Sequence, residues 1–187
     1  DLNGDEYPDL VAQSTSSWQA QPTSPNEDKA NPERRPRVHL MVNDGNGYFN
    51  SGLSLMANED YHRIHTYKDV FLADLNNDGL DDILTGSGGG GPLLNETIDD
   101  GILLLMSDAE TGQYSDQTNL INFPRITRDR GEFTEEVLAL AGVDLFVAAD
   151  INNDGWKDLV TMAVAGGERG AFPLVLLNQE GAGFVPW

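Results

Sequence analysis

The chain has 187 residues, no cysteine, and 31 acidic residues against 11 basic ones, which gives a formal net charge of -20. Such a charge argues against nucleic acid or an anionic membrane as a partner, because both require a basic face. No apolar run is long enough to cross a bilayer, so we expect no membrane-spanning segment.

One acidic motif occurs three times, beginning at Asp1, Asp74 and Asp150, with starts 73 and 76 residues apart. Each copy has Asp or Asn at positions 1, 3, 5 and 9 and runs directly into apolar residues. Oxygen-bearing side chains at alternate positions of a tight loop are typical ligands of a hard cation such as Ca²⁺. One such run alone is also compatible with an ordinary turn, but three copies in phase favour a repeat architecture with one loop per unit.

Each repeat is predicted to contain short strands around its acidic loop. In the first repeat, strands are expected at residues 10–12 and 38–42, and another begins after Gly47. In the second they lie at 70–73, 83–85 and 102–106 and after Gly112, and in the third at 145–149, 159–164 and 174–177 and after Gly183. These runs lack helical spacing, so the predicted fold class is all-β with four-stranded units. One short helix is predicted over residues 132–141, where Phe133, Val137, Leu138 and Ala141 share one side.

Four-stranded units arranged radially form a β-propeller of four to eight blades. Even four blades at this spacing need about 290 residues, so the chain accounts for a partial propeller of about two and a half blades. The remaining blades are then expected in the same or another chain. The predicted division is 1–73 for the first repeat, 74–149 for the second and 150–187 for an incomplete third. The first repeat lacks its own entering strand and has a long insertion at 13–37, and residues 66–73 enter the next blade.

The acidic loops with their Asp-Leu-Val or Asp-Ile-Leu exits, and the string Asn-Asp-Gly-Asn-Gly-Tyr-Phe at residues 43–49, resemble FG-GAP/VCBS repeats. These are the calcium-loop blades of integrin α-chain propellers and of many secreted bacterial proteins. The chain is closer to the bacterial type, because the Phe-Gly and Gly-Ala-Pro strings that name the family are not intact. The resemblance implies an extracellular, seven-bladed propeller with Ca²⁺ held in the loop between the first two strands of each blade.

Carried over position by position, the resemblance implies side-chain ligands at loop positions 1, 3, 5 and 9 and a backbone carbonyl at position 7. The residues are Asp1, Asn3, Asp5, Tyr7 and Asp9; Asp74, Asn76, Asp78, Leu80 and Asp82; and Asp150, Asn152, Asp154, Trp156 and Asp158. Gly79 and Gly155 at position 6 allow a sharp turn, whereas the first loop has Glu6 there. A non-glycine residue at positive φ costs energy, so the first loop fits the motif least well.

An EF-hand loop begins in the same way but requires a bidentate Glu at position 12 and flanking helices. Position 12 is Ala12, Thr85 or Thr161 in the three copies, and the exits are strand-like. The sequence therefore excludes an EF-hand. The expected role of Ca²⁺ is structural, because three carboxylates in one tight loop repel each other until a cation neutralises them.

The sequence shows no Ser/His/Asp or Cys/His constellation, so we expect a non-catalytic module that binds an extracellular protein or glycan, as in adhesion. Calcium loops suit the high extracellular Ca²⁺ concentration, which predicts a secreted or cell-surface location. The segments 13–37, with Trp18, and 86–101 are expected on the face opposite the loops, as a recognition surface or as disordered insertions. Two alternatives stay open: a structural piece of a larger surface assembly, and an accessory domain of a secreted polysaccharide-active enzyme.

Overall fold

The computed structural model of the chain describes residues 1–14, 37–58, 70–86, 102–122, 125–129, 134–138, 146–164 and 171–187. Across these ranges the structure is all-β, with two single-turn 3₁₀ helices. None of the helices described there has the length and apolar character needed to cross a bilayer.

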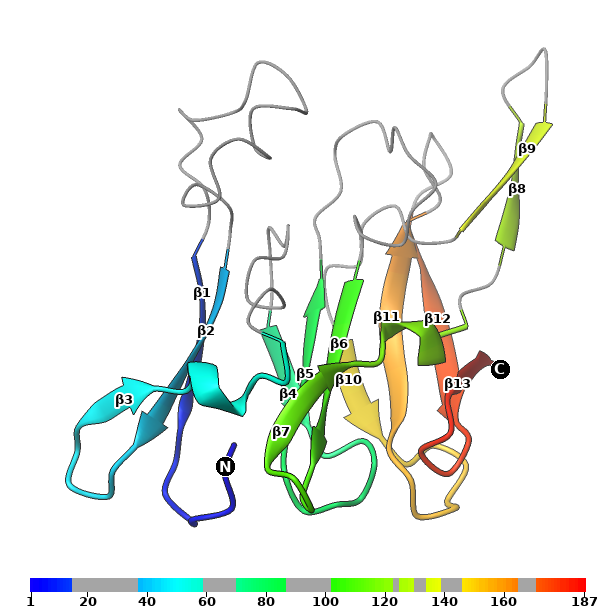
Figure 1. Cartoon of the computed structure of the whole chain (residues 1–187). Coiled ribbons are helices and arrows are strands. Elements are labelled where there is room, and N and C mark those ends of the chain that lie inside the picture. Colours follow the sequence, from blue (N-terminus) through cyan, green and yellow to red (C-terminus); the bar gives the residue numbers. More distant parts are fainter. Residues whose placement is uncertain are drawn as a thin grey trace, which may run out of the picture.

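Apart from β8 (Arg125–Asp129) and β9 (Thr134–Leu138), the described strands form three antiparallel sheets that lie side by side in chain order (Figure 1). The first sheet contains β1 (Leu10–Ser14), β2 (Arg37–Asn43) and β3 (Phe49–Ser51). The second contains β4 (Val70–Ala73), β5 (Asp82–Gly86), β6 (Ile102–Asp108) and β7 (Gln113–Asp116). The third contains β10 (Phe146–Ala149), β11 (Asp158–Val164), β12 (Ala171–Asn178) and β13 (Phe184–Pro186). Consecutive strands are hydrogen-bonded neighbours in every sheet, so the predicted strand order is confirmed.

The predicted helix over residues 132–141 is wrong. Residues Thr134–Leu138 form strand β9, which pairs with β8 (Arg125–Asp129) in a separate two-stranded sheet. The pairing sets Ile126 opposite Val137 and Thr127 opposite Glu136. β-branched residues favour a strand, and a helix this short is marginal without a packed face, so cross-strand pairing prevails.

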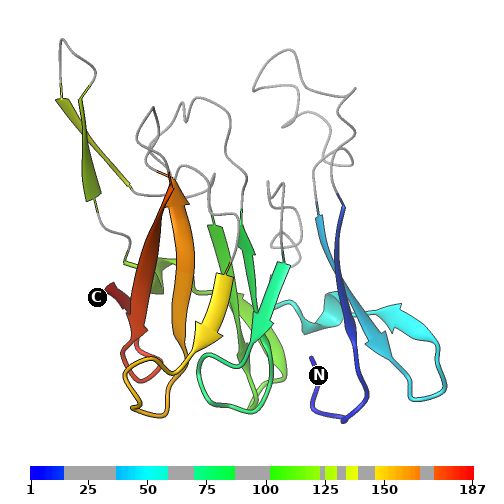
Figure 2. The ribbon, with the colours of Figure 1, turned by 180° about the vertical axis from the view of Figure 1, so that it is seen from behind.

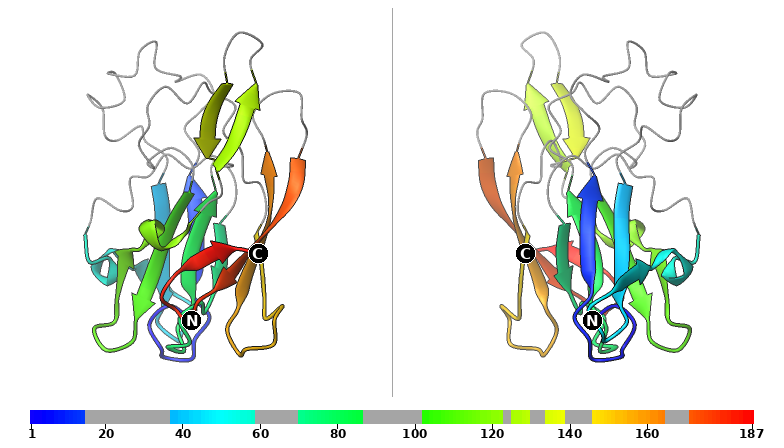
Figure 3. Two further views of the ribbon diagram at one scale, coloured as in Figure 1. Left: turned by 90° about the vertical axis from the view of Figure 1, so that its right-hand side faces the viewer. Right: turned by 90° about the vertical axis from the view of Figure 1, so that its left-hand side faces the viewer.

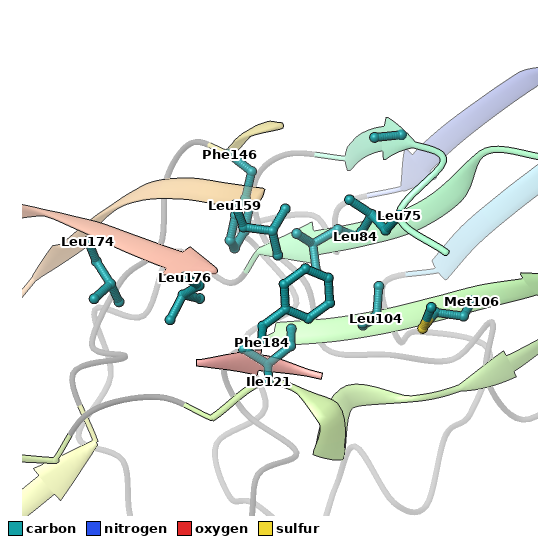
Figure 4. Close-up of a cluster of buried hydrophobic side chains, with 11 residues drawn as sticks. Leu75, Leu84, Leu104, Met106, Ile121, Phe146, Leu159, Leu174, Leu176 and Phe184 are labelled. Atoms are coloured by element: carbon teal, nitrogen blue, oxygen red, sulfur yellow. The ribbon is translucent and has the colours of Figure 1, made fainter. Parts of the chain in front are cut away.

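Adjacent sheets pack face to face through two apolar clusters. The first interface, between the first and second sheets, buries Leu2, Val38, Leu40, Met56, Ile83, Leu103, Leu105 and Tyr114. The second interface, between the second and third sheets, is drawn in Figure 4 and includes Leu75, Leu84, Leu104, Met106, Ile121, Phe146, Leu159, Leu174, Leu176 and Phe184. Alternate residues of β5 and β6 contribute to opposite interfaces. The second sheet is therefore buried on both faces, which explains the unbroken apolar runs of its strands.

The segment that follows the last strand of each of the first two sheets forms a backbone bridge to the last strand of the next sheet. After β3, the 3₁₀ turn η3 (Leu53–Leu55) leads to Met56, which forms a parallel bridge with Tyr114 of β7. After β7, η6 (Thr118–Leu120) leads to Ile121, which bridges Phe184 of β13 in the same way. The exits thus connect neighbouring sheets by backbone pairing as well as by apolar contact.

All three acidic loops lie at one end of the stack, as the views from behind and from both sides show (Figures 2 and 3). Strands alternate in direction, so the connections between β1 and β2, β5 and β6, and β11 and β12 leave from the opposite end. Most of the predicted recognition segments, 15–36 and 87–101, lie outside the described residues. The division into repeats at 73/74 and 149/150 stays a prediction.

Candidate functional site

The acidic loops at residues 1–9, 74–82 and 150–158 share one backbone conformation. Positions 4 and 6 have a positive φ in every copy, at Gly4 (78°), Asn77 (57°), Asn153 (61°), Glu6 (69°), Gly79 (92°) and Gly155 (91°). Two left-handed residues separated by one position fold the chain back on itself. Glu6 thus has the unfavourable φ expected for it, and the first loop differs from the others by placing its glycine at position 4.

Side chains at positions 1, 3 and 5 accept three backbone hydrogen bonds that recur in all three loops. The N–H of position 5 donates to the amide oxygen of position 3 at 3.1, 3.1 and 3.0 Å in the first, second and third loops. The N–H of position 7 donates to the carboxylate of position 5 at 2.9 Å in each. The N–H of position 6 donates to the carboxylate of position 1 at 2.9, 3.1 and 2.9 Å. The side chains therefore close each loop from inside.

The Asp at position 9 has a different role, since it binds its loop to the next-to-last strand of its sheet, which is β2, β6 or β12. One carboxylate oxygen accepts the N–H of loop position 2, at 2.7 Å for Asp9, 2.7 Å for Asp82 and 2.9 Å for Asp158. The other accepts the N–H of the residue that ends or follows the apolar run of β2, β6 or β12, at 2.8, 2.7 and 2.8 Å; these donors are Asn43, Ser107 and Asn178. Asp82 and Asp158 are fully buried, so these bonds replace water that the carboxylates have lost.

Ser107 connects two carboxylates of the second loop. Its hydroxyl lies 2.8 Å from Asp82 Oδ1 and 3.1 Å from both oxygens of Asp78. Burial raises the pKa of Asp82 to about 6, although the hydrogen bonds from Ser107 and Leu75 favour its charged form and oppose this rise. Two carboxylates thus lie close to Ser107 where the second loop meets its sheet.

The side chain at position 7 packs on the turn between the last two strands of its sheet. A Cβ at Gly45 would lie 2.6 Å from the Tyr7 ring, and one at Gly181 would lie 3.1 Å from the Trp156 ring. Both glycines also have positive φ, so both space and conformation require glycine there. In the second loop the position is Leu80, which is buried.

Within the described residues, no group of three or more His, Cys, Asp or Glu side chains is placed to hold a metal ion. The position-9 carboxylate bonds to the sheet, and each loop also has two further carboxylates, one amide oxygen and the carbonyl of position 7. All are hard oxygen donors of the kind Ca²⁺ accepts. A carboxylate offers about four lone-pair sites. Asp150 accepts one N–H bond at each oxygen, which leaves capacity for a cation. Asp78 accepts more, since its Oδ2 receives both the Asn76 amide and the Ala109 N–H. Positions 1, 3, 5 and 7 therefore fit Ca²⁺ by their chemistry, and the assignment of the loop residues as ligands stays a prediction.

Comparison with known families shows a similarity in the first part of the chain. Residues 1–85 match the FG-GAP-like repeat. This FG-GAP-like segment contains the first two acidic loops and runs from the first sheet into β5. FG-GAP repeats are found in integrin-like β-propeller modules for adhesion or ligand binding, and the family often binds calcium. A search of curated proteins found no match to the chain.

Sequence reasoning missed the residues that join one loop to the neighbouring sheet. Asn178 Nδ2 donates to the carbonyl of Leu75 across the second interface, and Tyr114 Oη donates to the carbonyl of Leu2 across the first. A partial signal was present, because Asn43 and Asn178 follow the apolar run of the third strand in two repeats. Ser107 occupies the same place in the second repeat and obscures the pattern.

Proposed function

We propose that the chain is part of a calcium-stabilised, extracellular β-propeller that binds a protein or glycan ligand without catalysis. The observation that carries this proposal is the threefold recurrence of one acidic loop, with one hydrogen-bond pattern, at one end of three stacked sheets. The FG-GAP-like match over residues 1–85 supports it. A secreted or cell-surface location follows from the calcium requirement of such loops.

Further blades are part of this proposal, and the outer face of the third sheet supports them. When the third sheet is aligned with the second by strand register, Val147 corresponds to Phe71, Ile151 to Leu75 and Val160 to Leu84. In the second sheet, Phe71, Leu75 and Leu84 pack against the third sheet. Leu75 is 1% exposed, whereas Ile151 is 39% and Val147 is 49% exposed. A sheet face that repeats a buried apolar pattern fits another blade of the same kind, in this chain or in another.

Ca²⁺ would be held by the side chains at positions 1, 3 and 5 and the carbonyl at position 7, and it would neutralise carboxylates that share one loop. In the second loop these are Asp74, Asn76, Asp78 and Leu80, in the third Asp150, Asn152, Asp154 and Trp156, and in the first Asp1, Asn3, Asp5 and Tyr7. Asp9, Asp82 and Asp158 act from position 9 by holding each loop against its sheet. The cation then contributes to folding stability, since binding favours the folded loop.

Thermal unfolding of the full chain in EDTA and in millimolar Ca²⁺ tests this proposal. Binding at a free concentration of about 100 times Kd stabilises the folded state by about 2.7 kcal/mol per site, so the melting temperature should rise clearly. Asp78→Ala and Asp154→Ala should each reduce the rise. Glu110→Ala removes an exposed carboxylate on the β6–β7 turn and should leave it unchanged. An equal melting temperature with and without Ca²⁺ would contradict calcium stabilisation.

Ligand binding is proposed for the face opposite the loops, where segments 13–37 and 86–101 leave their sheets. Glycan and protein arrays probed with the full chain in Ca²⁺ would identify the ligand class. Deletion of either segment should abolish binding while the calcium-dependent rise in melting temperature persists. Binding that survives both deletions would place the ligand elsewhere.

A further inference from the structure

The backbone carbonyl at loop position 2 receives its hydrogen bond from the next sheet, not from its own. Asn178 Nδ2, in the third sheet, lies 2.7 Å from the carbonyl oxygen of Leu75 in the second loop. The same Nδ2 lies 3.0 Å from the carbonyl of Lys157, so the amide spans the third loop and the loop before it. Leu75 and Asn178 are each about 1% exposed, so water does not compete for these bonds.

This contact completes a chain of hydrogen bonds between the second and third loops. Asp82 accepts the N–H of Leu75 at 2.7 Å, and the carbonyl of Leu75 accepts Asn178 Nδ2. The backbone N–H of Asn178 then donates to Asp158 at 2.8 Å, and Asp158 accepts the N–H of Ile151 at 2.9 Å. The position-9 carboxylates of two neighbouring loops are thus joined through a single side chain. A shift of either loop would break a buried bond, which is costly.

The first interface uses another donor for the same carbonyl. Tyr114 Oη lies 3.2 Å from the carbonyl of Leu2 and 2.8 Å from that of Asp81. A hydroxyl has one proton to donate, so it satisfies these two acceptors only in turn, and the nearer one is Asp81. Ser107, which stands where Asn178 stands in the next sheet, has no amide to offer. The hydrogen bond to the position-2 carbonyl is therefore weaker at the first interface than at the second.

We propose that Asn178 is a positioning residue that couples cation binding at the second and third loops, so that filling one loop raises the affinity of the other. The proposal rests on the function proposed above, because it requires that the loops bind a cation. Its physical basis is that a filled loop holds its position-2 residue in place through the Asp at position 9. Leu75 is shared by the second loop and Asn178, because its N–H donates to Asp82 while its carbonyl, in the following peptide unit, accepts from Asn178. Fixing Leu75 for one loop therefore removes part of the ordering cost for the other.

Terbium luminescence can test the coupling in the full chain, with Tb³⁺ as a Ca²⁺ substitute. Trp156 occupies position 7 of the third loop and sensitises an ion bound there, and Trp156→Leu, which copies Leu80, identifies this signal by its loss. Disabling the second loop by Asp78→Ala should weaken Tb³⁺ binding at the third loop about fivefold or more. In an Asn178→Ser background, which copies Ser107, the same Asp78→Ala change should have no effect on third-loop affinity.

The matched control is Asn43→Ser. Asn43 holds the equivalent place in the first sheet, and its Nδ2 donates to the carbonyl of Pro8 within that sheet. Asp78→Ala should therefore still weaken the third loop about fivefold in the Asn43→Ser background. A second measurement leaves Asn178 unchanged: hydrogen exchange at the Leu75 amide in Asp78→Ala should slow when Tb³⁺ fills the third loop.

The possible outcomes separate the two proposals. Absence of Tb³⁺ luminescence together with an unchanged melting temperature would overturn the proposed function and the coupling with it. Luminescence with a third-loop affinity indifferent to Asp78→Ala would overturn the coupling alone. Persistence of the fivefold effect in Asn178→Ser would show that Asn178 is not the route. A Leu75 amide unaffected by third-loop filling would also contradict the proposal.

Discussion

The two interfaces between sheets solve the same problem with different residues. At the first, the aromatic residue of the fourth strand is Tyr114, and its hydroxyl reaches the carbonyl of Leu2 from the preceding loop. At the second, the aromatic residue is Phe184, which has no hydroxyl, and Asn178 from the neighbouring strand reaches the carbonyl of Leu75. A buried carbonyl needs a donor, but the donor need not occupy a fixed position. Repeats can therefore diverge in sequence while their interfaces keep the same hydrogen bond.

The largest expected effect on the free energy of unfolding comes from removing the Asp at position 9. We compare this change in the second sheet, which is covered on both faces, with the same change in the first sheet, which is partly exposed. Asp82→Ala would leave the N–H groups of Leu75 and Ser107 buried without an acceptor, so we expect a loss of about 4 kcal/mol in the free energy of unfolding. Asp9→Ala, where the carboxylate and the Asn43 donor are half-buried, should cost about 2 kcal/mol because water can replace the bond to Asn43, although Leu2 is buried. Urea denaturation in EDTA measures both without a contribution from the cation. Equal losses would show that burial does not distinguish the two sheets.

A smaller effect is expected from removing the hydroxyl that serves the first interface. Tyr114→Phe makes this position resemble Phe184 and leaves the carbonyls of Leu2 and Asp81 without that donor, at a cost of about 1.5 kcal/mol. Adding Ser107→Asn supplies the amide that the second interface uses, and the double variant should recover part of the loss. Chemical denaturation of the single and double variants measures the recovery. A double variant no more stable than Tyr114→Phe would mean that the two donors are not interchangeable.

Loop position 6 gives a third comparison, with expected effects of about 1 kcal/mol in opposite directions. Glu6→Gly should stabilise the first loop by about 1 kcal/mol, because Glu6 has a φ of 69° that glycine adopts without strain. Gly155→Ala should destabilise the third loop by about 1 kcal/mol. The space beside Gly155 is open, so its φ of 91° is the source of the cost. Melting temperatures in EDTA test both changes, and a stabilising Gly155→Ala would contradict the conformational argument.

The smallest expected difference concerns two threonines at the same position of neighbouring sheets. The Thr85 hydroxyl is buried and has no hydrogen-bond partner among the described residues, whereas Thr161 has a partner. Thr85→Val should therefore raise the free energy of unfolding by about 0.5 kcal/mol, and Thr161→Val should lower it by about 1 kcal/mol. Urea denaturation compares the two variants directly. Losses of equal size would indicate that Thr85 is also satisfied.

The sequence predicted the fold better than the contacts between repeats. The strands of the three sheets were located by the three acidic motifs in phase and by the strand starts after Gly47, Gly112 and Gly183. This succeeded because each of these strands is marked by residues next to it in the sequence. The segment around Thr134–Leu138 was assigned wrongly as a helix, because its strand depends on pairing with Arg125–Asp129. The role of Asp82 as a tie to Ser107, and of Asn178 as a donor to Leu75, needed the fold, since these partners lie 25 and 103 residues apart.

The bridges made by Met56 and Ile121 bear on where the chain can be cut. Each residue follows the last strand of one sheet yet pairs with the last strand of the next, and the adjoining N–H groups of Ala57 and Asn122 donate to Tyr114 and Phe184 at 2.8 Å. A fragment that begins with the first strand of the second or third sheet therefore lacks the segment that pairs with the last strand of that sheet. The smallest unit for shortening, extending or recombining this architecture is therefore two neighbouring sheets together with the segment that links them, and not a single sheet.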